Sequence, residues 1–225
     1  MSHKGHSIVT IESLDSGFEP RTRRQTSPLD YFTSTLLLVR PYFMVANRRL
    51  PYRLLSSMAP PLFFPEFRRV YSDLKGPLMI MVSLATILLY GLYSPERTLM
   101  WDIATTAKLT VGYWLGLSVL AFLLGYFCQT NLTLPQFLSI TGYSFTGHCL
   151  VLFIAEVLHQ EENHGVFFFL TTVFGGLATG RLVIIILART PGPAQRLVMC
   201  SVLACVNLMH LIYIHFACMR NKFQI

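Results

Sequence analysis

Charge is scarce in this chain and is unevenly signed. Only 13% of its 225 residues are charged, whereas 53% are hydrophobic, a balance typical of integral membrane proteins. Acidic residues number 11 against 18 lysines and arginines, which gives a formal net charge of +7. In a chain this apolar, the excess indicates positive charge held on the cytoplasmic side of a bilayer, and we expect no nucleic-acid partner.

Catalytic signatures are also absent. The sequence contains no recognisable serine–histidine–acid set, P-loop or glycine-rich nucleotide fingerprint, which predicts a protein that is not an enzyme and uses no cofactor. Its five cysteines lie in or beside apolar runs, so we interpret them as small buried hydrophobic residues and not as a disulfide framework. Residues 1–10 lack an apolar core, and we therefore expect no cleaved signal peptide.

Long apolar runs are missing before residue 77 and frequent after it, which predicts four regions. These are a disordered cytosolic tail at 1–30, a basic and aromatic juxtamembrane segment at 31–76, a membrane domain at 77–219 and a short lumenal tail at 220–225. Residues 31–71 allow two interpretations. They form either short amphipathic pieces whose arginines face anionic lipid headgroups, or a solvated basic linker.

Five apolar runs predict five transmembrane helices, at 77–93, 104–127, 137–158, 165–188 and 197–219. Each is close to the roughly 20 residues that a helix needs to cross about 30 Å of hydrocarbon. Only helices and closed barrels span a bilayer, and these runs lack the two-residue alternation of barrel strands. The predicted fold class is therefore all-α, a polytopic membrane protein with five transmembrane helices.

Lysines and arginines predict the orientation of these spans. Eleven of them precede Pro77, and Arg189 and Arg196 flank the loop between the fourth and fifth spans. The positive-inside rule then places the N-terminus in the cytosol and, after five spans, the C-terminus in the lumen. In this topology the glycosylation sequon at Asn131 lies in the cytosol.

Polar residues inside the spans are the first place to look for function. They are His148, Glu156, Arg181, Asn207 and His210. The interpretation we favour is hydrogen bonding between helices, with Arg181 extending toward the membrane surface. Two alternatives stay open: a transport pathway lined by His148, Glu156, Arg181 and His210, and a metal site built from His148, Cys149, Cys205 and His210. No recognised metal-binding spacing supports the second.

Small residues predict close helix packing. A Gly-x-x-x-Gly pattern occurs at Gly112 and Gly116 in the second span and again at Gly176 and Gly180 in the fourth. The third span carries Gly142 and Gly147. Such positions let two backbones approach closely, either within one chain or between two chains, and the sequence leaves both arrangements open.

Two motifs resemble a known family. Asp73-Leu74-Lys75-Gly76-Pro77 reads as the water-to-membrane junction, with Asp73 capping a helix and Pro77 in its first turn. It resembles the Asp/Glu-Leu-Tyr-Gly-Pro signature of the Yip-domain (YIPF) family, except that Lys75 replaces the tyrosine. Gly142-Tyr143-Ser144 resembles that family's Gly-Tyr motif in its third span. Further pieces, including Arg40-Pro41-Tyr42-Phe43, extend the resemblance over about residues 36–219, and it is closest to the third member of the family.

The resemblance implies a five-pass, non-enzymatic protein of the early secretory pathway that supports vesicle trafficking and Golgi structure. It implies location in the Golgi membrane, in the cis-Golgi, with cycling through the ER. The implied partners are a second Yip-domain protein, of the type of the fourth family member, and Rab GTPases. A small transporter or channel using the intramembrane polar residues is the alternative function.

Overall fold

The structure is a computed structural model that describes residues 40–44, 50–58, 72–92, 98–158 and 164–219. These residues belong to one compact unit, Val39–Ile225. Those described are almost entirely helical and include no strand, which confirms the all-α prediction. The tails expected at 1–30 and 220–225 lie outside the described residues.

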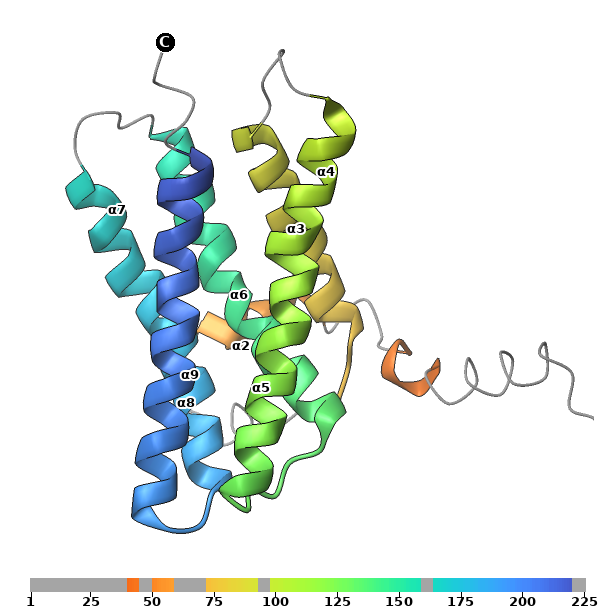
Figure 1. Cartoon of the computed structure of the whole chain (residues 1–225), viewed down its shortest axis with the longest axis vertical. Coiled ribbons are helices and arrows are strands. Elements are labelled where there is room, and N and C mark those ends of the chain that lie inside the picture. Colours follow the sequence, from red (N-terminus) through yellow and green to blue (C-terminus); the bar gives the residue numbers. More distant parts are fainter. Residues whose placement is uncertain (1–39, 45–49, 59–71, 93–97, 159–163, 220–225) are drawn as a thin grey trace, which may run out of the picture. The chain divides into compact units, whose positions relative to one another are not determined.

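Five stretches are long and apolar enough to cross a membrane, as the sequence predicts (Figure 1). Among the described residues, two short helices precede them, η1 (Arg40–Tyr42) and α2 (Leu50–Met58). The spans are built from α3 (Lys75–Leu92); α4 (Leu99–Ala107), η4 (Lys108–Gly112) and α5 (Tyr113–Phe127); α6 (Leu134–Val157); α7 (His164–Leu170), η5 (Thr171–Gly175) and α8 (Gly176–Arg189); and α9 (Pro193–Ile214) with η6 (His215–Met219).

The helices start earlier than the apolar runs predict, because polar residues and prolines occupy their first turns. The second span begins at Leu99 instead of residue 104, and its first turn includes the buried Asp102. The third begins at Leu134, where a capping box joins Thr133 to Gln136. The fifth begins at Pro193, since proline suits the first helical turn.

Three of the described segments, η4, η5 and η6, are π-helical. η4 and η5 lie inside continuous spans, between α4 and α5 and between α7 and α8. A π turn inserts one extra residue and shifts the backbone carbonyls out of the regular α-helical ladder. These carbonyls can then accept hydrogen bonds from a neighbouring helix.

α6 is the central helix of the bundle. Two-thirds of its most apolar window is buried (67%), against 33–50% for the other four spans. It contacts α2, α3, α5, α7 and α8, and its Phe145, Val151 and Leu152 are fully enclosed. α3 runs parallel to it, since Pro77 meets Gly142 at one end and Ile87 and Phe153 line one groove near the other.

α2 packs with the membrane helices. It contacts α3, α6 and α8, and the buried Ser57 donates a hydrogen bond from its Oγ to Thr146 Oγ1 of α6 at 3.1 Å. The two interpretations of residues 31–71 did not include these contacts of α2 with the bundle. Ser57 and Arg53 of this helix contact residues of other segments, which the local sequence does not reveal.

Candidate functional site

The junction motif holds a buried carboxylate shared by three segments of the chain. Asp73 is 5% exposed, and its Oδ1 lies 2.9 Å from the guanidinium nitrogen Nη1 of Arg53 on α2. Its Oδ2 accepts a hydrogen bond of 2.7 Å from the Tyr143 hydroxyl on α6. The sequence predicted a helix cap at Asp73. The structure instead uses its carboxylate to connect α2 and α6 to the start of α3.

The two family-like motifs also fit together sterically. A side-chain carbon added to Gly76 would overlap the phenol ring of Tyr143, and one added to Gly142 would overlap the ring of Pro77. Each motif therefore supplies a glycine that makes room for a ring of the other. Leu74 extends the junction in the opposite direction, because its backbone N–H donates a 2.9 Å hydrogen bond to the carbonyl of Tyr42 in η1.

A second polar cluster lies where α6, α8 and α9 meet, and Asn207 is at its centre. The Nδ2 of this fully buried amide donates to Thr179 Oγ1 on α8 at 2.8 Å. His148 on α6 is 1% exposed, and its Nε2 lies 3.2 Å from the Asn207 carbonyl. Because a carbonyl oxygen only accepts, Nε2 is inferred to carry the ring hydrogen. These contacts tie three spans together without any charged group.

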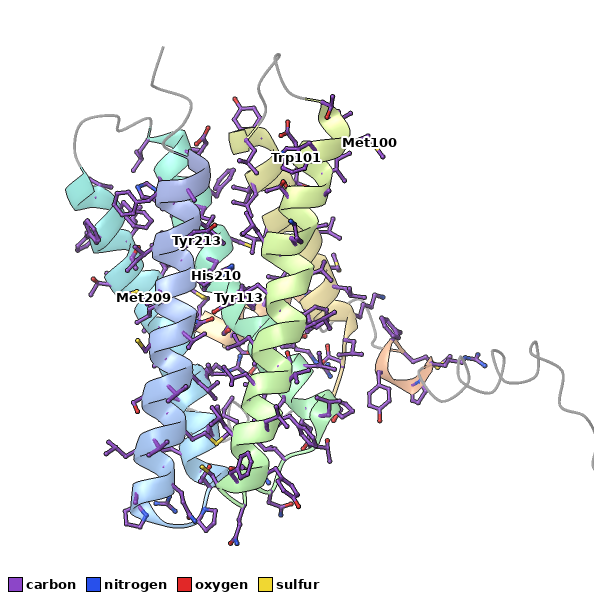
Figure 2. The ribbon with its side chains drawn as sticks, in the orientation of Figure 1. Met100, Trp101, Tyr113, Met209, His210 and Tyr213 are labelled. Carbon is purple, nitrogen blue, oxygen red and sulfur yellow. The ribbon has the colours of Figure 1, made fainter. Side chains whose placement is uncertain are left out.

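His210 extends the cluster from α9 to α5 (Figure 2). Its ring stacks on Tyr113 with centroids 3.4 Å apart, and its Nε2 donates to the Leu109 carbonyl of η4 at 3.0 Å. Tyr113 in turn donates from its hydroxyl to the Val206 carbonyl of α9 at 2.7 Å. The ring centroids of His148 and His210 are 5.5 Å apart. Both histidines therefore lie in one region of the core.

The structure does not gather the four residues of the transport alternative. Glu156 lines a groove between α3 and α6, and Arg181 lines a different groove along α8. The lining residues of these grooves include neither His148 nor His210. A single pathway lined by all four side chains is thus not formed by the described residues.

The metal alternative is not assembled either. Within the described segments, no group of three or more histidines, cysteines or acidic residues is positioned to hold a metal ion. Cys149 Sγ donates to the Ile80 carbonyl of α3 at 3.6 Å, and Cys205 is exposed on the surface of α9. These two cysteines therefore do not join the histidine pair.

The glycines divide into two groups. At Gly142 and Gly147 the space that a side chain would take is occupied by neighbouring atoms. A side-chain carbon on Gly147 would lie 2.8 Å from both Ala178 Cβ and the Phe174 carbonyl oxygen. The four glycines of the Gly-x-x-x-Gly patterns are open: nothing lies within 4 Å at Gly116, Gly176 or Gly180, and only the Ala107 carbonyl lies 4.0 Å from Gly112. The described part of the chain thus leaves both glycine faces uncovered.

The open face of α8 is hollowed into a groove of about 380 Å³. Its lining residues follow one side of the helix for three turns and comprise Thr172, Val173, Gly176, Leu177, Gly180, Arg181 and Ile184. Arg181 is buried beside the glycines. The described residues of this face therefore form a shallow, mostly apolar groove along η5 and α8.

Sequence reasoning did not single out Arg53, Tyr113 or Thr179 for these contacts. Tyr113 belongs to the Gly112–Gly116 pattern, but a lone tyrosine in an apolar run gives no signal of its partner. Thr179 had no signal at all, because hydroxyls in membrane helices commonly bond to their own backbone. Arg53 appeared as one of many basic residues before the first span and in the family-like piece Arg53-Leu54-Leu55, with no sign of its partner.

A comparison with known protein families covers the segments described above. The family model described as the YIPF3 C-terminal domain matches residues 48–219. The matched region includes α2, the junction motif, both polar clusters and all five candidate spans. No solved structure matches this chain.

Proposed function

This chain belongs to the YIPF family and is close to YIPF3, and on that premise we propose that it supports vesicle trafficking and Golgi structure as a non-enzymatic membrane protein. Family membership and the five apolar helices make it a multi-pass membrane protein of the secretory pathway. The proposal adds that it acts in complex with a second Yip-domain protein, of the type of the fourth family member. Rab GTPases are proposed as further partners.

The open glycine groove of α8 is the observation that carries the pairing proposal. Lipid tails are as apolar as leucine, so hydrophobicity alone does not pair two helices inside a bilayer. Close packing of backbones and hydrogen bonds must do so, and glycines permit the closest approach. Gly176 and Gly180 meet no atom of the described residues within 4 Å, whereas Gly142 and Gly147 are already packed against their own chain. The groove is therefore suited to a helix from another chain.

Orientation and location are part of the proposal. The N-terminus lies in the cytosol and the C-terminus in the lumen, because lysines and arginines concentrate before the first span. The basic N-terminal segment contacts anionic lipid headgroups. The protein resides in the cis-Golgi and cycles with the ER, as expected for the family.

The experiment that tests the function is capture of the tagged full chain from cells in mild detergent, with its partners identified. Selective recovery of a Yip-domain protein or of Rab GTPases supports the proposal. The rival transporter function predicts solute flux in vesicles that contain the purified protein, and this flux must fall when His148 is replaced. Flux of that kind, without recovery of either partner class, overturns the proposal.

A further inference from the structure

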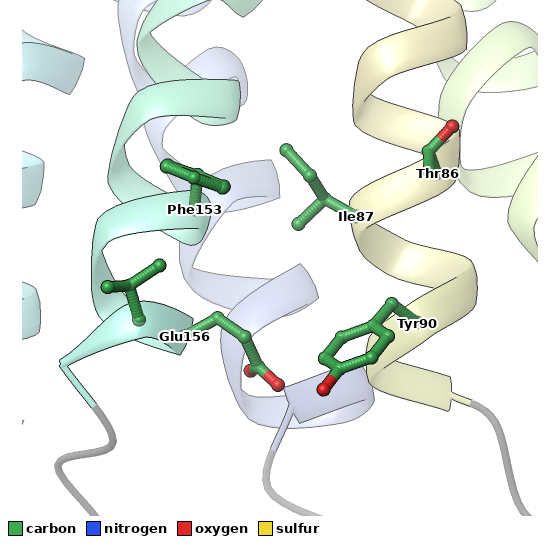
Figure 3. Close-up of a pocket in the computed structure, with 6 residues that line it drawn as sticks. Thr86, Ile87, Tyr90, Phe153 and Glu156 are labelled. Atoms are coloured by element: carbon green, nitrogen blue, oxygen red, sulfur yellow. The ribbon is translucent and has the colours of Figure 1, made fainter.

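The first span, α3, begins beside the interior of α6 and not beside its start. Pro77, in the first turn of α3, meets Gly142 of α6. Farther along the same two helices, Ile87 and Phe153 line one groove (Figure 3). Gly142 lies about 12 Å from Leu134, the first residue of α6, at a rise of about 1.5 Å per residue. Figure 1 accordingly shows α5, α8 and α9 extending below the start of α3.

α2 touches α6 at a still deeper level. Ser57 of α2 bonds to Thr146 of α6, and Thr146 lies about 18 Å from the start of α6 on the same scale. The 24 residues of α6 extend over about 36 Å, against about 30 Å of hydrocarbon in a bilayer. The contact between Ser57 and Thr146 is therefore close to the middle of the membrane. α2 itself has 9 residues and is about 13 Å long, too short to cross it.

The polar side of α2 faces the protein, and its apolar side faces outward. Ser56 and Ser57 are 4% and 1% exposed, whereas Tyr52 and Leu55 are 50% and 73% exposed. A helix on the surface of a soluble protein has the reverse arrangement, because water favours serines outside and leucines inside. Both serine hydroxyls of α2 also donate to backbone carbonyls of the same helix, so they are satisfied without water.

The charge on α2 is paired at the same depth. Arg53 is the one charged residue of this helix, and its guanidinium lies 2.9 Å from the Asp73 carboxylate. That carboxylate accepts a hydrogen bond from Tyr143, which precedes Thr146 by less than one turn of α6. Charged side chains within a bilayer face the protein interior and pair with one another in this way. The outward side of α2 carries no charge at all.

We propose that α2 is embedded in the bilayer, with lipid acyl chains bound along its Tyr52 and Leu55 side. The helix lies in the half of the membrane that contains the start of α6 and does not cross to the other half. Because α2 packs against α3, α6 and α8, its outward side continues the lipid-facing surface of these spans. The inference does not depend on the partner proposed for α8, since it concerns lipid contact within one chain.

The test places a tryptophan on the outward side of α2 and measures its depth. The chain has two tryptophans, so Trp101→Phe with Trp114→Phe gives a background without native tryptophan fluorescence. Leu55→Trp is added to this full chain, which is reconstituted in phosphatidylcholine vesicles containing lipids brominated near the middle of the acyl chain. The brominated lipids quench a tryptophan that lies in hydrocarbon, whereas acrylamide quenches one that is reached from water.

Two positions on α5 calibrate the measurement. Val119→Trp lies on an exposed side about 12 Å from the end of α5, and Phe127→Trp lies exposed at that end. Brominated-lipid quenching of Leu55→Trp is expected within about twofold of Val119→Trp, and its acrylamide quenching several-fold below that of Phe127→Trp. Acrylamide quenching of Leu55→Trp as strong as that of Phe127→Trp places α2 in a water-filled recess and overturns the proposal.

A charged substitution gives a second measurement in the parent chain, which does not require the tryptophan-free background. Leu55→Asp directs an unpaired carboxylate toward acyl chains, where a charge is unfavourable. The yield of folded chain from membranes, measured by size exclusion, should fall as it does for Val119→Asp. Leu99→Asp, at the exposed start of α4, is the control and should keep the parent yield. An unchanged yield for Leu55→Asp, beside a loss for Val119→Asp, also rejects the proposal.

Discussion

Tyr113 and His210 stack face to face with their ring planes 2° apart, and each donates a hydrogen bond to the backbone of the span that carries the other. Tyr113 reaches the Val206 carbonyl of α9, and His210 reaches the Leu109 carbonyl of η4. The π turn is what brings the Leu109 carbonyl into reach, because it shifts that carbonyl from the regular ladder. The second and fifth spans are therefore joined at a defined register.

Removing the Tyr113 hydroxyl should weaken this joint by a small amount. Tyr113→Phe keeps the stacked ring and loses one hydrogen bond, for which we expect about 0.6–1.7 kcal/mol. His210→Leu loses both the stack and a hydrogen bond and should lower the melting temperature further. Thermal unfolding in detergent measures both effects. Tyr213→Phe, on the exposed side of α9, is the matched control, and an equal effect of this change contradicts the prediction.

The buried carboxylate of the junction makes a stronger prediction. Arg53→Met leaves Asp73 without its cation, and breaking a buried pair of this kind typically costs about 3–5 kcal/mol. Asp73→Asn together with Arg53→Met removes both charges, so the double variant should be more stable than Arg53→Met alone. Thermal unfolding of the single and double variants measures this coupling. A double variant that is no more stable than Arg53→Met would contradict the prediction.

Alanine substitutions should separate the filled glycines from the open ones. Gly142→Ala and Gly76→Ala force a methyl group into a ring, and overpacking typically costs about 1–3 kcal/mol. Gly116→Ala meets open space inside a helix, where alanine is favoured over glycine by up to about 1 kcal/mol. The first two variants should therefore melt below the parent chain and the third at or above it. The same ordering is checked by resistance to proteolysis in detergent.

Larger substitutions in the α8 groove test pairing instead of folding. Gly176→Leu and Gly180→Leu should leave the isolated chain stable and reduce co-precipitation of a tagged Yip-domain partner about tenfold or more, since a side chain there separates the two backbones. Ala188→Leu is the control, because it enlarges an exposed alanine of the same helix outside the groove. The parallel pair Gly112→Leu and Gly116→Leu tests the face of η4 and α5. If all four leucine variants pair normally, the glycine faces do not bind the partner, and residues 31–71 become the better candidate for the binding segment.

Glycosylation mapping tests the orientation. A sequon placed on a spacer after Ile225 should be modified, because the proposed orientation places the C-terminus in the lumen. Asn131, whose backbone N–H donates to the Arg189 carbonyl at 3.2 Å, should stay unmodified, because the proposed orientation places its loop in the cytosol. Modification after Ile225 is the decisive result, because an asparagine in a short loop between helices is a poor glycan acceptor on either side of the membrane. Absence of modification after Ile225, with the chain fully inserted, reverses the topology.

The five spans were predictable because the bilayer imposes a length and an apolar composition that a single sequence records. The helix ends were less so, since Thr133 and Pro193 begin helices from outside the apolar runs. Partners across the bundle were not predictable. Asp73 meets a tyrosine 70 residues away, and nothing near Asp73 in the sequence distinguishes that contact from a helix cap.

The sequence also does not reveal which glycines pack against another helix. Gly142 and Gly180 look alike in sequence, yet the first lies under Pro77 and the second under no described atom within 4 Å. Which glycine is filled depends on where distant helices cross. A pattern of small residues therefore predicts that a close approach occurs, whereas the identity of the approaching backbone requires the fold.

The distance in sequence between Asp73 and Tyr143 also sets an order of events during synthesis. The carboxylate, α2 and the start of α3 leave the ribosome first, and the hydroxyl that completes their contact follows 70 residues later. At roughly 5–20 residues per second that interval is about 4 to 14 s. Throughout it, a young chain carries an incomplete polar contact at its first span. The arrival of the third span, which carries Tyr143, completes the contact.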